Sequence, residues 1–73
     1  MSQNQEPTAS ELAEIIQEFE QYRDRLLNET MEAAKRAKLP KSTVMAKLEP
    51  ELKQIDAKIQ ELRDRHAAVT LGG

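Results

Sequence analysis

The sequence predicts an all-α protein that folds as an antiparallel two-helix hairpin with coiled-coil-like packing. The chain has 73 residues, which is enough for one small domain and no more. Gly occurs twice and Pro three times, so little interrupts helical structure. Apolar residues recur with helical spacing over two long stretches that a short connector separates. Helices of similar length joined by so short a link are expected to run side by side and antiparallel.

The first helix is predicted over residues 10–38. Thr8 and Glu11 have the spacing of a capping box, and Ser10 is an alternative N-cap. Residues 1–9 hold almost no large apolar side chain, so we expect a disordered tail there. The apolar residues of the helix form a stripe about 140° wide, and they are Leu12, Ile15, Ile16, Phe19, Tyr22, Leu26, Leu27, Ala33, Ala34 and Ala37.

The second helix is predicted over residues 42–70, after a connector over 39–41. Pro40 pushes the residue before it out of the helical region, and Ser42 or Thr43 can cap the helix that follows. The apolar spacing then alternates between three and four residues for nearly four heptads, which favours a left-handed supercoil. The positions in this series are Met45, Leu48, Leu52, Ile55, Ile59, Leu62, His66 and Val69.

Pro50 lies inside this heptad series. A proline in a helix interior costs about 3 kcal/mol and clashes with the carbonyl group four residues earlier. We therefore expect a break or a kink at Pro50, and we favour the break. At the other end of the second helix, residues 72–73 are expected to form a C-terminal cap and tail.

The apolar stripe of the first helix is wider than one neighbouring helix can cover, and a chain of this size buries little surface by itself. We expect one part of the stripe to form the hairpin seam with the second helix, through Leu12, Ile16, Phe19, Leu26, Leu48, Leu52, Ile55, Ile59 and Leu62. The remaining edges should face a partner, through Ile15, Tyr22, Leu27 and Met31. Two hairpins would then pair into a four-helix bundle with twofold symmetry.

This pattern predicts a non-enzymatic protein–protein interaction module, such as a small adaptor, assembly or regulatory protein, that works as a homodimer. No Cys is present, and the only histidine, His66, has no acidic residue at metal-binding spacing beside it. Ser42 and Thr43 have no base nearby that could activate them. We therefore expect no catalytic residue, no cofactor, no metal site and no small-molecule substrate.

Charge is unevenly distributed along the chain. Residues 1–32 hold eight acids and two bases, whereas residues 33–48 hold five bases and no acid. Three interpretations stay open: favourable interaction with the helix dipole, antiparallel association of two copies, and binding of a nucleic acid or another polyanion. The polyanion contacts would be Lys35, Arg36, Lys38, Lys41 and Lys47.

The connector region reads Ala34-Lys35-Arg36-Ala37-Lys38-Leu39-Pro40-Lys41-Ser42-Thr43-Val44, followed by Leu48. It resembles the helix-turn-helix of some bacterial transcriptional regulators, which often carry a short Leu-Pro-x-Ser-Thr-Val stretch between their helices. Ala34 and Val44 match the two buried positions, while Lys38 replaces the usual turn glycine and Lys47 an apolar residue. The resemblance implies an alternative function, a small DNA-binding regulator that uses residues 34–48.

No run approaches the roughly 20 apolar residues that a membrane span needs. Residues 1–10 carry no Lys or Arg, which a secretory signal would have. We therefore expect no membrane span and a cytoplasmic protein.

Overall fold

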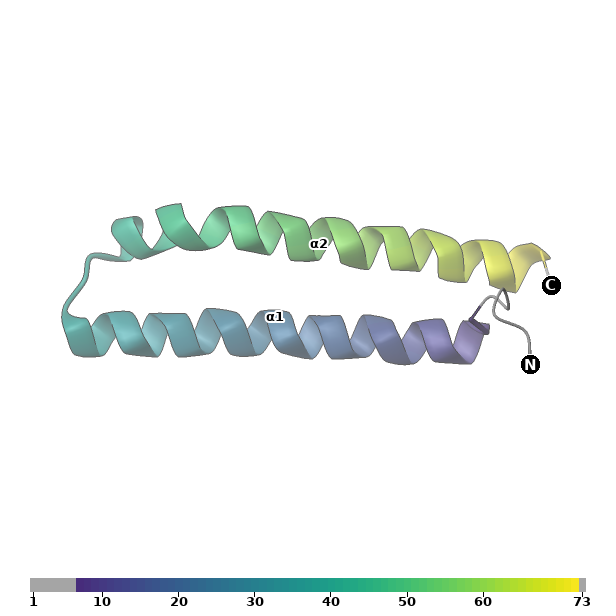
Figure 1. The fold of residues 1–73 in the computed structure, drawn as a ribbon, viewed down its shortest axis with the longest axis horizontal. Coiled ribbons are helices and arrows are strands. Elements are labelled where there is room, and N and C mark those ends of the chain that lie inside the picture. The colour runs from purple at the N-terminus through teal and green to yellow at the C-terminus, as the bar shows by residue number, and fades with distance from the viewer. Residues whose placement is uncertain (1–6, 73) are drawn as a thin grey trace.

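The computed structural model describes residues 7–72 and contains two helices, α1 (Ala9–Ala37) and α2 (Lys41–Gly72). They lie side by side, run in opposite directions and form a rod of 51 × 19 × 18 Å (Figure 1). The predicted all-α antiparallel hairpin is confirmed. Both helices begin one residue earlier than expected, and α2 extends to Gly72. Of the predicted tails, residues 1–6 and residue 73 lie outside the described residues.

The start of α1 is fixed by the capping box that the sequence predicts. The Thr8 hydroxyl accepts a hydrogen bond from the Glu11 backbone N–H at 3.1 Å, and the Glu11 carboxylate accepts one from the Thr8 N–H at 2.8 Å. The two bonds satisfy two backbone donors at the helix terminus, and the acid also interacts favourably with the helix dipole. Thr8, and not Ser10, is therefore the N-cap.

The end of α1 is a left-handed turn at Lys38, which has φ 58° and ψ 38°. The Lys38 N–H donates to the carbonyl groups of Ala34 and Lys35, and the Leu39 N–H donates to Ala34 at 2.9 Å. This is the hydrogen-bond pattern of a Schellman motif, in which glycine usually takes the left-handed position. The chain then leaves α1 at Leu39 and enters α2 after Pro40.

The cap predicted for the second helix is wrong. α2 begins at Lys41, and its first backbone bond runs from the Val44 N–H to the Pro40 carbonyl at 3.2 Å. The N-cap position is therefore Pro40, and Ser42 and Thr43 lie within the first turn, two and three residues too late to act as N-cap.

The break predicted at Pro50 is also wrong, and a kink is not confirmed. α2 is one helix from Lys41 to Gly72 with Pro50 inside it. Pro50 lies on the solvent-exposed side of α2, as does Ala46, the residue whose carbonyl loses its helical partner. Water can satisfy that carbonyl, while Leu48 and Leu52 on either side of the proline stay buried against α1.

The core is a single row of side chains between the two helices. Seven of them are buried: Leu12, Ala34, Val44, Leu48, Leu52, Ile59 and Leu62. In α2, every described side chain that is not exposed belongs to the predicted heptad series or is Val44. The alternating spacing of three and four residues keeps one side of α2 against α1 along its whole length.

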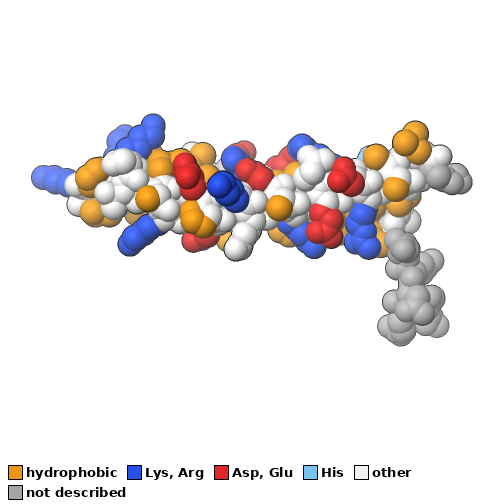
Figure 2. Space-filling view, turned by 90° about the horizontal axis from the view of Figure 1, so that it is seen from above, with side chains coloured by type: hydrophobic (Ala, Val, Ile, Leu, Met, Phe, Trp, Pro, Cys, Tyr) orange, Lys and Arg blue, Asp and Glu red, His pale blue; other side chains and the backbone are white. Residues whose placement is uncertain are grey.

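Charged side chains of both signs lie on the outer surface, with apolar and uncharged groups between them. Figure 2 shows one face with acidic and basic side chains mixed along the middle of the rod, and with Lys and Arg at the end that carries the turn. This end holds the five bases of residues 33–48, and all five are exposed. We call Lys35, Arg36, Lys38, Lys41 and Lys47 the basic tip.

Candidate functional site

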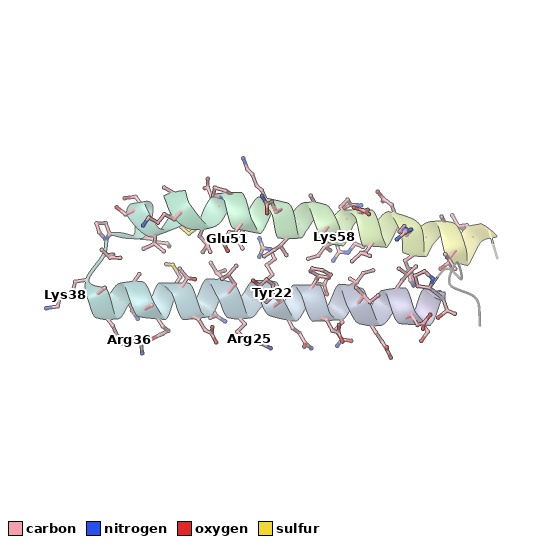
Figure 3. All side chains as sticks on the ribbon, in the orientation of Figure 1. Tyr22, Arg25, Arg36, Lys38, Glu51 and Lys58 are labelled. Carbon is pink, nitrogen blue, oxygen red and sulfur yellow. The ribbon has the colours of Figure 1, made fainter. Side chains whose placement is uncertain are left out.

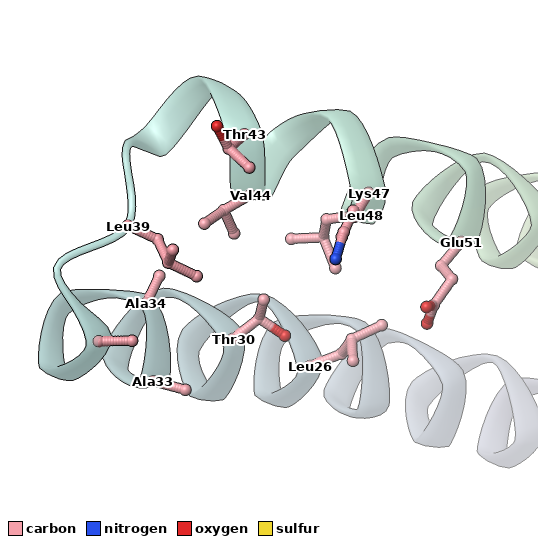
Figure 4. A pocket seen from close by; sticks show the side chains of 11 residues that line it. Leu26, Thr30, Ala33, Ala34, Leu39, Thr43, Val44, Lys47, Leu48 and Glu51 are labelled. Carbon is pink, nitrogen blue, oxygen red and sulfur yellow. The ribbon is translucent and has the colours of Figure 1, made fainter.

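An apolar groove of about 330 Å³ opens between the helices beside the turn. Figure 4 shows the side chains that line it, with α1 forming one wall and α2 the other. The residues of α1 that line it are Leu26, Thr30, Ala33, Ala34 and Ala37, and Leu39 follows in the connector. Those of α2 are Thr43, Val44, Lys47, Leu48 and Glu51. We call this the turn groove.

The groove exists because the side chains of α1 become small toward the turn. Ala33, Ala34 and Ala37 extend only one carbon from the backbone, so they cannot fill the space that larger residues fill elsewhere between the helices. Leu39 partly covers the open end, but 52% of its surface stays exposed. A large apolar side chain from outside this chain could fill the remaining space.

Two charged residues border this apolar surface, and two more lie nearby at the end of α1. Lys47 and Glu51 lie at its edge on α2, and Figure 4 shows the Glu51 side chain reaching toward α1. Lys38 lies at the turn, and Arg36 projects from the side of α1 away from α2 (Figure 3). The site therefore combines an apolar floor with one basic and one acidic residue at its edge, Lys47 and Glu51.

Two ion pairs tie the helices together farther from the turn. The Arg23 Nε donates to Asp56 Oδ1 at 2.6 Å and its Nη2 donates to Oδ2 at 3.3 Å, while Arg63 pairs with Glu20. The hydrogen bond with Asp56, and secondly the charge of that carboxylate, raise the pKa of Arg23 above its usual value. Arg23 therefore stays charged at every pH of practical interest. We call this side of the hairpin the ionic edge.

The opposite side of α1 is apolar. Tyr22 is two residues from Glu20, so the two side chains point about 160° apart around the helix. Tyr22 is 49% exposed and lines a shallow hollow with Glu18 and Phe19. The turn groove continues this side toward the turn, through Leu26 and Ala33. We call this side, from Ile15 to Ala37, the apolar edge.

The four residues predicted to face a partner lie on two different sides of α1. Ile15 and Tyr22 lie on the apolar edge, whereas Leu27 and Met31 lie toward the ionic edge. Tyr22 is exposed and the other three are half-buried. Of the predicted seam residues, Leu12, Leu48, Leu52, Ile59 and Leu62 are buried, and Ile16, Phe19, Leu26 and Ile55 are half-buried.

Sequence reasoning missed the link between Arg23 and Asp56 and the groove itself. The sequence does contain a signal for the ion pair. Arg23 follows Phe19 by four residues and precedes Leu26 by three, which is the spacing of a residue that faces the second helix. Its partner lies 33 residues later, across the antiparallel connector. The alanines of α1 signalled the groove, since a small residue at a seam position leaves a space.

Catalytic and metal-binding features are not evident in the described part of the chain. Among residues 7–72 no cluster of His, Asp and Glu is arranged to hold a metal ion. The acids Glu20 and Asp24 line an open polar cleft on the ionic edge, where Arg63 and Arg23 also lie. His66 is half-buried, and its carbonyl accepts a hydrogen bond from the Thr70 hydroxyl at 2.7 Å. No helix within these residues is long and apolar enough to cross a membrane.

The segment 34–48 forms the turn of the hairpin, with α1 and α2 side by side (Figure 1). In a helix-turn-helix, by contrast, the two helices cross at about 90–120° and the second is free to enter a groove of DNA. Ala34 and Val44 are buried, as the resemblance implies, but against each other's helix in an antiparallel pair.

Comparison with known proteins identifies a family whose description names no function. Residues 10–71 match the family model described as a domain of unknown function, DUF8630, and the chain belongs to this family. The matched stretch includes nearly all of both helices. No curated protein and no solved structure matches the chain.

Proposed function

We propose that this member of the DUF8630 family is a non-enzymatic protein–protein interaction module that associates through the apolar edge of its hairpin. The observation that carries the proposal is the apolar surface that the hairpin leaves uncovered, which consists of the exposed Tyr22 and, one helical turn later, the turn groove that begins at Leu26. Uncovered apolar surface with a polar rim is typical of interaction sites. Such a protein would act in the cytoplasm as a small adaptor, assembly or regulatory protein.

Self-association is the simplest form of this function. A second hairpin can cover the apolar edge, so that the two hairpins form a four-helix bundle. Identical chains associate most often as twofold dimers. The buried row of seven side chains is a small core for a hairpin of this length, so an added interface would also stabilise the fold.

Size-exclusion chromatography with light scattering tests the proposal over concentrations from micromolar to millimolar. We expect a particle of twice the chain mass of 8.3 kDa. A particle of the single-chain mass over the whole range would contradict self-association.

Two exposed neighbours on α1 provide a matched pair of variants. Tyr22→Ser should weaken association about tenfold or more, because exposed aromatic anchors dominate interface energies. Gln21→Ser lies on a different side of α1 and should leave association unchanged. Both variants should keep the helical circular dichroism of the parent. Equal effects of the two substitutions would show that the apolar edge is not the interface.

The second candidate function is that of a small DNA-binding regulator, and the exposed basic tip is the observation that favours it. An electrophoretic shift with duplex DNA at several salt concentrations tests it, because phosphate contacts require affinity to fall as salt rises. Replacing Lys35 and Arg36 with Gln should reduce that dependence. Absence of a shift at low salt would leave only the protein-interaction function.

A further inference from the structure

We infer that the occupant of the turn groove is a second copy of this chain, which runs antiparallel along α1 and inserts its own Phe19 and Tyr22. The inference rests on the proposed function and adds to it the register and the two-fold axis, which passes beside Leu26. Each copy then fills the groove of the other. The following observations on size, charge and the opposite edge support it.

The spacing of residues on the apolar edge is symmetric about Leu26. Tyr22, Phe19 and Ile15 lie 4, 7 and 11 residues before it, and three small residues lie at the same distances after it, namely Thr30, Ala33 and Ala37. At 100° per residue all seven positions fall within an arc of about 80°. They therefore form one narrow stripe, with large side chains in its first half and small ones in its second.

An antiparallel pairing about Leu26 sets large side chains against small ones. Tyr22 faces the second copy's Thr30, Phe19 faces its Ala33, and Ile15 faces its Ala37. The small residues line the turn groove, which the hairpin itself does not fill. The large residues are half-buried or exposed in the single hairpin, so they can enter the groove of the second copy. A parallel pairing would set Phe19 against Phe19 and alanine against alanine, which leaves the grooves empty.

Charge supports the same direction. The acidic first half of α1 carries Glu11, Glu14 and Glu18, and the basic tip lies at the opposite end of the rod. In the antiparallel pair each acidic half meets the other copy's basic tip. Glu18 and Arg36, which are five turns apart and lie on the same side of α1, border the stripe near its two ends. A parallel pair would bring like charges together.

The ionic edge is less suited to hold the second copy. Its two ion pairs cross between the helices, with the Arg23 and Asp56 side chains 33% and 52% exposed, so a partner there would have to cover charged groups. On the apolar edge, Glu18, Lys47 and Glu51 border the apolar surface, but among residues 7–72 no ion pair crosses between the helices there.

Disulfide trapping tests this register, and the chain contains no Cys of its own. Leu26→Cys should cross-link to itself in a mild redox buffer, because a residue beside the two-fold axis meets its own copy. An equimolar mixture of Phe19→Cys and Ala33→Cys, one of them extended by a tag, should give the mixed dimer in preference to either self-linked product. Tyr22→Cys with Thr30→Cys repeats the measurement at a second pair.

The matched control is Gln21→Cys, which is exposed on another side of α1. We expect about tenfold less cross-linked product from it than from Leu26→Cys, since the dimer raises the effective thiol concentration only at the interface. Circular dichroism of each reduced variant shows whether it is folded, and the second cysteine pair replaces any variant that is not.

The outcomes separate the register from the proposed function. A particle of twice the chain mass in which Phe19→Cys links to itself, or in which Leu27→Cys on the ionic edge links best, would overturn the register and leave self-association standing. A single-chain particle at millimolar concentration would overturn both the register and self-association. In cells, a product of Leu26→Cys with a different protein, and none between copies, would overturn the choice of occupant.

Discussion

Two regions of this hairpin have the same apolar spacing but different interiors. In the filled half, farther from the turn, Leu12, Leu52, Ile59 and Leu62 are buried and two ion pairs cross between the helices. In the turn half, from Thr30 to Leu48, alanines on α1 oppose Val44 and Leu48, and a groove remains. The comparison teaches that periodicity sets which side of a helix faces its neighbour, while side-chain volume sets whether the space between them is closed.

The largest expected effect comes from placing a charge in the filled half. Ile59 is 5% exposed, and Ile59→Asp replaces this buried apolar side chain with a carboxylate that must lose its hydration. We expect a loss of about 4 kcal/mol or more in the free energy of unfolding, enough to unfold so small a hairpin. The loss is measured by circular dichroism at 222 nm. Gln54→Asp, at an exposed position of α2, should change stability only slightly.

The next effect compares one leucine from each half. Leu52→Ala removes a side chain that is 8% exposed and should cost about 2–5 kcal/mol, because it leaves a cavity. Leu39→Ala removes one that is 52% exposed and should cost about 1 kcal/mol or less. Urea unfolding at low protein concentration measures both. Equal costs would show that the turn half is packed as tightly as the filled half.

Pro50 marks the boundary between the two halves, and its replacement should raise stability. Pro50→Ala restores the backbone bond to the carbonyl of Ala46 and removes a ring clash, for a gain of up to about 3 kcal/mol. Thermal unfolding measures the gain, with Glu49→Ala at the exposed neighbouring position as the control. An unchanged or lower stability would mean that the proline contributes to the packing of the turn half.

The smallest effect concerns the turn itself. Lys38 takes the left-handed conformation at a cost that glycine avoids, so Lys38→Gly should stabilise the hairpin by about 1 kcal/mol. Lys41→Gly removes the same charge from the first turn of α2 and should destabilise it, because glycine weakens a helix. If both substitutions change stability in the same direction, charge and not backbone conformation determines the effect.

The sequence predicted the hairpin because its strongest signals are local. The capping box at Thr8 and Glu11, the stop at Leu39-Pro40 and the heptad series of α2 each depend on residues only a few positions apart. The two local errors, at Pro50 and at the start of α2, have one physical reason. Tertiary packing on both sides of a weak position outweighs its intrinsic preference, as buried Val44, Leu48 and Leu52 show.

By itself the sequence determined the helices, their antiparallel order and the side of α2 that faces α1, since a period of 3.6 residues and one short connector allow little else. Only the tertiary structure decided which edge of α1 is bridged by ions and which stays apolar. That choice depends on the relative rotation of the two helices, which brings Arg23 to Asp56 and leaves Tyr22 exposed on the opposite side. The turn groove has the same origin, because a space between two helices exists only once both are in place.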